Sequence, residues 1–171
     1  MYLEFFILVA DYFKTLSRRI VLYEIVTPFL FAIIVCILIM QGMNTSICKK
    51  FIENSLTLLG ILVGFSITII TILTTGNSRN LQAIKNKTTQ HEIGGKRISL
   101  FDLLLINFTY SVVIEICLII FLLLAPVFLS NIQLSKQVEI IGFSLVVGAV
   151  IHVLLLMMRN LTDFYLILLK K

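Results

Sequence analysis

The chain has 171 residues, a net charge of +5 and a mean hydropathy of +1.07, and it is 59% hydrophobic and 13% charged. Soluble domains are usually about 45–50% apolar and about 25% charged, and one this small could not bury so much apolar surface. The composition therefore excludes an ordinary soluble domain. It indicates a single membrane domain, residues 1–171. Its excess of Lys and Arg is explained by the basic bias of cytoplasmic loops in membrane proteins, and we expect no direct binding of nucleic acid.

The first predicted element is a helix over residues 1–19. Glu4, Asp11, Lys14 and Arg18 recur at helical spacing, and aromatic and aliphatic residues occupy the other faces. This pattern predicts an amphipathic helix that lies on the cytoplasmic surface of the membrane. The alternative is that the segment extends the first spanning helix into the cytoplasm.

Four apolar stretches are long enough to cross a bilayer, for which a helix needs about 20 residues. They are residues 20–40, 56–75, 101–129 and 138–158. Their hydrophobic runs are continuous, whereas the strands of a membrane barrel alternate between apolar and polar residues. We therefore expect an all-α membrane protein with four transmembrane helices in a bundle.

The second predicted span carries small and hydroxyl residues on one face. Gly60, Gly64, Thr68 and Thr71 recur at spacings of three and four, as does Thr75 at the end of the span. A Gly-x-x-x-Gly pair lets two helix backbones approach closely. The face is either a pore-lining or oligomer-forming surface, or a surface of ordinary packing within the bundle.

The connection over residues 76–100 is the largest segment outside the spans. It begins with Gly76-Asn-Ser-Arg-Asn and contains Gly94–Gly95, so helix-breaking residues flank a short polar piece that is a candidate helix. Its basic residues are Arg79, Lys85, Lys87, Lys96 and Arg97. They form either a docking surface for a cytosolic partner or a solvated linker.

The third predicted span contains Asn107, Ser111 and Glu115 on one face. A rise of 1.5 Å per residue places Glu115 about 20 Å deep, close to the bilayer midplane. An ionised carboxylate facing lipid there would cost at least about 2.5 kcal/mol, so Glu115 should face protein or water. It is a candidate for a proton relay, an ion path or a switch, or it is a neutral, hydrogen-bonded residue that fixes helix register.

The fourth predicted span places Ser144, Gly148, His152 and Arg159 on one face, with a second small-x-x-x-small pair. His152 is about 10 Å shallower than Glu115, which disfavours a direct pair between them. Glu24 in the first span differs from His152 by only about 4–5 Å in depth, and we predict a contact between these two. Glu115 should instead lie level with Gly64 and the Ser144–Gly148 stretch.

The basic residues predict the orientation. With both termini in the cytoplasm, only Lys49, Lys50 and Lys136 lie outside, on short connections over residues 41–55 and 130–137. The basic residues then inside are Lys14, Arg18, Arg19, Arg79, Lys85, Lys87, Lys96, Arg97, Arg159, Lys170 and Lys171. This distribution predicts a multi-pass membrane protein with both termini cytoplasmic.

No recognisable nucleotide-binding, protease or hydrolase motif occurs in the sequence. Cys36, Cys48 and Cys117 form no Cys-x-x-Cys or Cys/His pattern, so neither a disulfide framework nor a metal site is indicated. We therefore expect no enzymatic activity, no cofactor and no metal.

The segment from Gly60 through Gly-Phe-Ser-Ile-Thr into Gly76-Asn-Ser-Arg-Asn resembles a pattern in small bacterial membrane proteins. The overall plan, a short chain with four spans, tiny outer connections and a basic middle loop, resembles the KwaA-like membrane subunits of the Kiwa anti-phage defence system. That resemblance implies a homo-oligomeric membrane sensor, a tetramer, that signals to a cytosolic DNA-binding effector. It assigns no functional residue to a position of this chain.

These observations lead to one expected function and to alternatives. The expectation is an inner-membrane sensor or scaffold subunit of an anti-phage defence system, which oligomerises in the lipid bilayer and signals to a cytosolic effector protein. The alternative is a small homo-oligomeric ion channel or pore, lined by the threonine face or by Glu115. A third possibility is a toxin-like or immunity membrane protein.

Overall fold

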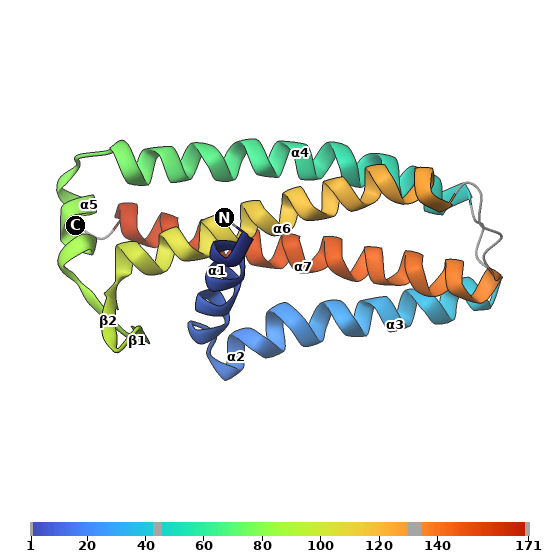
Figure 1. Cartoon of the computed structure of the whole chain (residues 1–171), viewed down its shortest axis with the longest axis horizontal. Helices are drawn as coiled ribbons and strands as arrows, with labels where there is room; N and C mark the ends of the chain where they lie inside the picture. The colour runs from blue at the N-terminus through green and yellow to red at the C-terminus, as the bar shows by residue number, and fades with distance from the viewer. Residues whose placement is uncertain (1, 43–45, 130–134, 170–171) are drawn as a thin grey trace.

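The computed structural model describes residues 2–42, 46–129 and 135–169 (Figure 1). Four of its helices are long and apolar enough to cross a membrane, namely Arg18–Met40, Ile47–Thr75, Leu100–Leu129 and Lys136–Ile167. The expected all-α bundle with four long apolar helices is confirmed. Lys170 and Lys171, which contribute to the predicted orientation, lie outside the described residues, as do parts of the two short connections.

The first span is built from three consecutive pieces, and a separate helix stands before it. The elements are α1 (Tyr2–Lys14), α2 (Arg18–Val21), the π-helical turn η1 (Leu22–Val26) and α3 (Thr27–Met40). The α1 helix ends where the Thr15 hydroxyl and backbone N–H both bond to the Tyr12 carbonyl, at 2.7 and 3.0 Å. Figure 1 shows α1 lying across the bundle rather than continuing along α3.

The rest of the chain forms three long helices and one small loop unit, made of α5, β1 and β2. The elements are α4 (Ser46–Thr75), α5 (Arg79–Asn86), β1 (Thr88–Ile93), β2 (Lys96–Ser99), α6 (Leu100–Leu129) and α7 (Lys136–Leu169). The α4 and α7 helices extend well beyond the apolar stretches that hydropathy marks out. Polar residues such as Lys50 and Arg159 lie on these extensions, because helical geometry continues where polar side chains reach solvent or a buried partner.

The connection over residues 76–100 contains a helix and a hairpin. The candidate helix is present as α5, and Ser78 caps its start by accepting a hydrogen bond from the Leu81 backbone N–H at 3.3 Å. Gly94 and Gly95 form the turn between the antiparallel strands β1 and β2, with φ values of +60° and +75°. Positive φ at both central residues is the requirement of the tightest hairpin turns, which glycine meets without strain.

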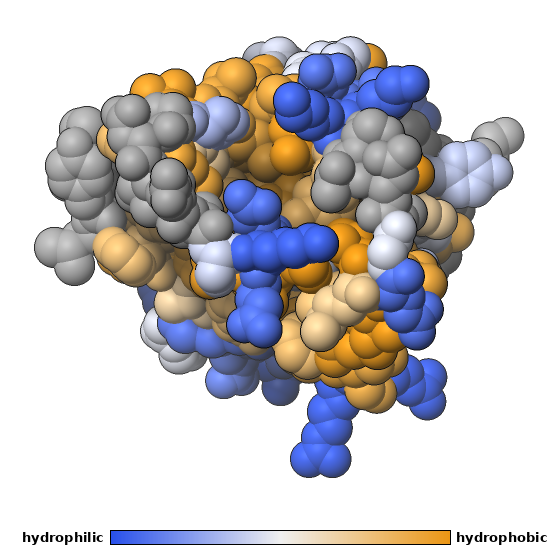
Figure 2. Space-filling model, turned by 90° about the vertical axis from the view of Figure 1, so that its right-hand side faces the viewer, coloured by the Kyte–Doolittle hydropathy of each residue, from blue (hydrophilic) through white to orange (hydrophobic). Residues whose placement is uncertain are grey.

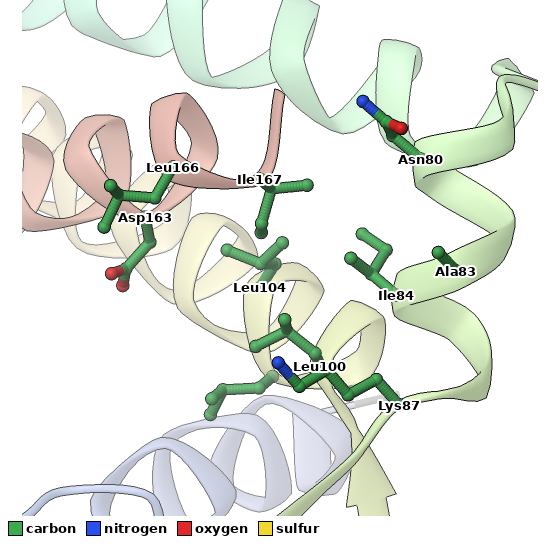
Figure 3. Close-up of a pocket in the computed structure, with 10 residues that line it drawn as sticks. Asn80, Ala83, Ile84, Lys87, Leu100, Leu104, Asp163, Leu166 and Ile167 are labelled. Atoms are coloured by element: carbon green, nitrogen blue, oxygen red, sulfur yellow. The ribbon is translucent and has the colours of Figure 1, made fainter. Parts of the chain in front are cut away.

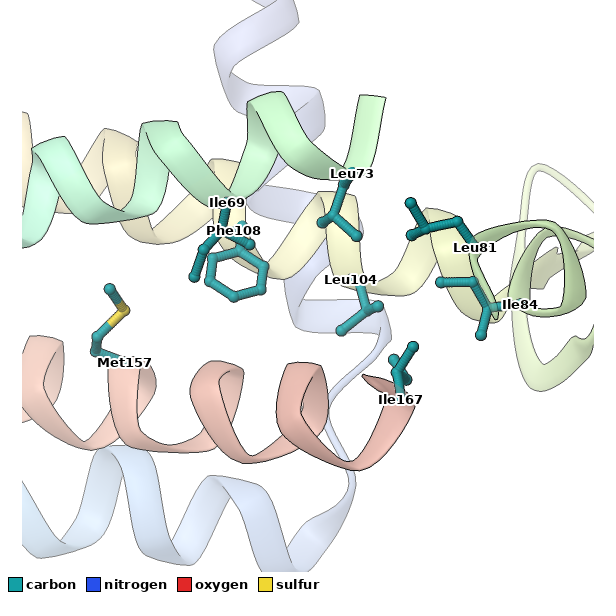
Figure 4. Packing of buried hydrophobic residues seen from close by; sticks show 8 residues of the cluster. All are labelled: Ile69, Leu73, Leu81, Ile84, Leu104, Phe108, Met157 and Ile167. Carbon is teal, nitrogen blue, oxygen red and sulfur yellow. The ribbon is translucent and has the colours of Figure 1, made fainter. Parts of the chain in front are cut away.

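The helices pack in a defined order, with α6 and α7 in contact with each other, α4 against α6, and α3 against α7 (Figure 1). A buried apolar cluster joins the ends of α4, α6 and α7 to α5 (Figure 4). Its members are Ile69, Leu73, Leu81, Ile84, Leu104, Phe108, Met157 and Ile167. Two of these residues, Leu81 and Ile84, belong to α5, so the loop unit shares the core of the bundle.

The outside of the bundle is strongly apolar along its length. Large side chains such as Phe29, Phe121 and Phe128 are 56–69% exposed. Figure 2 looks at the end where α3 leads to α4 and α6 to α7, and hydrophilic side chains gather on that end. They include Lys49, Lys50 and Lys136, all exposed. This distribution is that of a multi-pass membrane protein, with charge at the ends and apolar surface between them.

Candidate functional site

The π turn places a buried glutamate and a free carbonyl at one point of the first span. Glu24 lies in the middle of η1 and is fully buried. Pro28, four residues later, has no backbone N–H, so the Glu24 carbonyl lacks its normal α-helical donor. His152 Nδ1 lies 2.6 Å from that carbonyl oxygen. Because a carbonyl only accepts, the proton belongs on Nδ1 of His152.

The predicted contact between Glu24 and His152 is therefore present, but it uses the Glu24 backbone and not its carboxylate. The carboxylate has other partners. Its Oε1 lies 2.8 Å from Arg159 Nη1, and its Oε2 accepts a hydrogen bond from the Tyr12 hydroxyl at 2.5 Å. Arg159, expected as a cytoplasmic charge, is thus drawn into the bundle, where its side chain is 15% exposed.

Aromatic rings close this site on the side of α1. Tyr12 stacks on Tyr110 of α6, with ring centroids 3.6 Å apart and an interplanar angle of 5°. The Arg159 guanidinium lies 5.7 Å from the centre of the Tyr12 ring. Burial raises the pKa of Tyr12, and the hydrogen bond to Glu24 raises it further, so its hydroxyl stays a proton donor. We call Tyr12, Glu24, Tyr110, His152 and Arg159 the Glu24 cluster.

A second polar group lies deeper along α6. Asn107, Ser111 and Glu115 are all buried, at 5%, 0% and 0% exposed, so their common face points into the bundle. The Ser111 hydroxyl donates to Glu115 Oε1 at 2.8 Å. Ser66 of α4 lies beside the same carboxyl group, and its hydroxyl lies 3.7 Å from Met157 Sδ of α7. We call Ser66, Ser111, Glu115 and Met157 the Glu115 cluster.

The two clusters are joined through α6. Tyr110 belongs to the Glu24 cluster and its neighbour Ser111 to the Glu115 cluster. One helical turn away, Asn160 of α7 is fully buried and donates from Nδ2 to the Asn107 carbonyl at 3.3 Å. Asn160, which follows the predicted end of the last span at residue 158, has no role in the sequence-based site.

The two small-x-x-x-small motifs have different environments. A Cβ added to Gly148 would lie 3.1 Å from Ala32 Cβ and 3.2 Å from the Pro28 carbonyl oxygen, so this glycine allows α3 and α7 to approach closely. A Cβ on Gly60 or Gly64 would meet no atom within 4 Å. Packing within the bundle, one of the two interpretations of the α4 face, is therefore wrong for these two glycines, because α6 contacts the opposite face of α4.

The other residues of these two helix faces show the same contrast between an enclosed face on α7 and an open face on α4. Ser144 is 3% exposed and its hydroxyl donates to the Ile140 carbonyl at 2.8 Å. Thr68 and Thr71 are exposed, and their hydroxyls donate to the carbonyls of Gly64 and Ile67 at 2.8 and 2.9 Å. The α4 face thus points outward with its donors already satisfied.

The basic residues of the loop unit are all exposed, and two of them have partners. Lys85 Nζ lies 4.9 Å from the centre of the Phe101 ring, and Arg97 Nε lies 3.7 Å from Glu92 Oε1. Arg79, Lys87 and Lys96 are the other three. Beneath α5 is a cavity of about 470 Å³, in which Ala83 and Ile84 face Leu104 and Ile167 (Figure 3).

Comparison with known proteins gives no relative from which a function could be inferred, so the proposed function is based on the geometry described above. No protein-family model matches the chain, and no curated protein or solved structure shows significant similarity to it. No group of three or more His, Cys, Asp or Glu side chains that could hold a metal occurs among the described residues. What the described residues offer chemically is a buried ion pair, a buried carboxyl group and an exposed basic unit.

Proposed function

We propose that this chain is a sensor or scaffold subunit of a bacterial inner membrane, which assembles with copies of itself and passes a signal to a cytosolic effector. The anti-phage context rests on the resemblance to KwaA-like subunits described above. The physical mechanism is a shift between two packings of the bundle, biased by the state of the membrane. The chain supplies a membrane element, a buried coupling site and a partner-facing unit.

The observation that carries the proposal is the α5–β1–β2 unit. A flexible linker would have its charges in solvent and no fixed relation to the membrane helices. Here Leu81 and Ile84 are 5% and 7% exposed in the bundle core, while Arg79 and Lys96 are exposed, and Lys87 is exposed and lines the cavity beneath α5 (Figure 3). An ordered basic surface attached rigidly to spanning helices suits an acidic cytosolic partner.

The same unit contacts α1. The β1 strand packs against both α1 and α6, and α1 is anchored through Tyr12 to the Glu24 cluster. A shift in the position of α1 would therefore move the loop unit directly through β1. It would also disturb the Glu24–Arg159 ion pair, which Tyr12 of α1 contacts. This arrangement supports a coupling between the membrane side and the partner side.

The outward face of α4 supports self-association. Gly60 and Gly64 leave open space on a helix whose other face is already packed against α6. Close approach of a second backbone at such a pair is a common basis of helix association in membranes. A pore remains the second candidate, but Thr68 and Thr71 donate to their own helix and Glu115 is enclosed within one chain.

The test is a charge reversal on the loop unit, Arg79→Glu with Lys87→Glu and Lys96→Glu. Lys85 is left intact because its amine lies over Phe101. Exposed charge pairs contribute about 0.2–1 kcal/mol each, so reversing three should weaken binding of an acidic partner by about tenfold or more. Co-purification of cytosolic proteins in mild detergent, quantified by mass spectrometry, measures the loss.

The matched control reverses three lysines at the opposite end, Lys49→Glu with Lys50→Glu and Lys136→Glu. This variant should retain the partner, and both variants should keep the thermal unfolding midpoint of the parent chain. Full retention of the partner by the loop-unit variant would contradict the proposal, as would equal losses in both variants.

A further inference from the structure

A large groove opens between α6 and α7 near the end where these helices are joined. Its volume is about 870 Å³, and it is lined by several residues of α6 between positions 117 and 129, by Ile52 of α4, and on α7 by Val138, Glu139, Gly142, Phe143 and Val146. In Figure 1, α6 leans toward α4 at this end while α7 runs beside α3, so the two helices separate. Pro126 lies inside α6 here, and Gly142 on the facing helix leaves room because a Cβ there would meet nothing within 4 Å.

The lining is apolar over most of its length and charged at one end. Leu122, Phe143 and Val146 represent the walls, and Glu139 is the one carboxylate among the lining residues. Lys136 lies three residues before Glu139, so both project from the same side of α7. Both are exposed, and neither takes part in an ion pair within the described ranges.

We propose that this groove binds one zwitterionic phospholipid of the surrounding bilayer. An acyl chain lies between α6 and α7, the amine of the headgroup pairs with Glu139, and its phosphate pairs with Lys136. An apolar lining offers ordered water few hydrogen-bond partners, and the groove opens along the membrane-spanning helices, where acyl chains are the solvent. Clefts of about 300–1,000 Å³ hold drug-sized ligands, so a groove of this size has room for an acyl chain, with the headgroup at its charged end.

The charges at the end of the groove select among phospholipids. Lys136 would accept any phosphate, but Glu139 would repel a headgroup that carries only negative charge. A primary ammonium beside the phosphate satisfies both side chains, which favours phosphatidylethanolamine over phosphatidylglycerol. This inference is independent of the proposed function, since it needs neither a cytosolic partner nor a second copy of the chain.

The sequence offers a clean optical test because it contains no tryptophan. Phe143→Trp places a reporter on the wall of the groove, and Phe121→Trp is a second reporter on the opposite wall should the first perturb folding. Phe31→Trp, on the exposed surface of α3, reports ordinary lipid contact. Each variant is reconstituted in vesicles in which brominated phosphatidylethanolamine or brominated phosphatidylglycerol replaces part of the lipid, and quenching of tryptophan fluorescence is measured.

Groove reporters should prefer brominated phosphatidylethanolamine by about threefold or more, whereas Phe31→Trp should show no preference. Adding Glu139→Gln should remove the preference, and Gly142→Leu should fill the groove and abolish it. Ile141→Leu, on the neighbouring residue outside the lining, is the matched control and should change nothing. Equal quenching by both lipids at all reporters, or a preference that survives Gly142→Leu, would overturn the proposal.

Discussion

Glu24 is held by groups from two other elements, α7 and α1. Its carbonyl meets His152, and its carboxylate meets Arg159 of the same helix and Tyr12 of α1. Replacing a buried ion pair by apolar residues is often neutral, whereas removing one partner costs about 3–5 kcal/mol. The cluster therefore contributes more to which arrangement the helices adopt than to net stability.

Tyr12→Phe should loosen α1 while leaving the four spans folded. The change removes the donor to Glu24 Oε2 and keeps the stack on Tyr110, so docking of α1 should weaken by about 1–3 kcal/mol. Amide hydrogen exchange within α1 should accelerate accordingly. Tyr23→Phe, on a tyrosine that is 49% exposed, is the control and should leave exchange unchanged. Unaltered protection of α1 in Tyr12→Phe would contradict the anchoring role.

The raised pKa of Tyr12 adds a pH dependence to the same contact. Because the folded pKa lies above that of free tyrosine, the neutral hydroxyl is favoured in the docked state. The stabilisation should be fully present below pH about 10 and should decline as pH rises above it. Protection of α1 in the parent chain should therefore be constant across the neutral range.

Residue-level prediction succeeds where one physical cost dominates. Glu115 is buried because a carboxylate facing lipid would be expensive, and depth alone indicates this. Arg159 and Tyr12 escape prediction because their positions depend on which helices pair. A basic residue just past an apolar stretch reads as a cytoplasmic charge until Glu24, far away in sequence, is known to be opposite it.

At the level of elements, two similar motifs have opposite environments. Gly60-x-x-x-Gly64 and Ser144-x-x-x-Gly148 have the same spacing, and spacing tells only that their members share a face. The neighbour that occupies that face depends on the order in which helices pack. The α3 helix occupies the Gly148 face, whereas in one chain the Gly64 face is left open.

Gly148→Leu and Gly64→Leu should therefore have different effects. A leucine at position 148 collides with Pro28 and Ala32, which should lower stability by about 1–3 kcal/mol and separate α3 from α7. At position 64 a Cβ would meet no atom within 4 Å, so a leucine there should leave the unfolding midpoint in detergent unchanged. If the α4 face joins two copies, Gly64→Leu should reduce the oligomer to smaller species on size-exclusion chromatography with light scattering. An oligomer of unchanged size would remove α4 as the contact.

The hairpin shows a different limit of prediction. Gly94–Gly95 is recognisable as a breaker, yet β1 and β2 are short and rich in polar residues, so no alternating apolar pattern marks them. Two isolated strands of this kind are marginal without support. Contacts of β1 with α1 and α6 provide that support, and a reading confined to local sequence cannot include them.

For the whole molecule, the bilayer makes the number of spans predictable. Each span needs about 20 apolar residues regardless of its neighbours, so length and hydropathy suffice. The pairing of helices is not predictable in this way, because lipid-facing and helix-facing residues are both apolar. The four spans follow from composition, whereas the position of α1 across the bundle emerges only from the packed structure (Figure 1).

The orientation of the molecule rests on the charge distribution at its two ends. The loop unit lies at one end, α2 with Arg18 and Arg19 lies on the same side at the start of the first span, and the start of α4 with Lys50 lies at the other end (Figure 1). The positive-inside rule places the end with more basic residues in the cytoplasm. In a chain with Cys36, Cys48 and Cys117 replaced by alanine, Lys50→Cys should react with a membrane-impermeant maleimide in intact cells. Gln90→Cys, on the exposed face of β1, should react only after lysis, and the reverse pattern would place the loop unit and both termini outside.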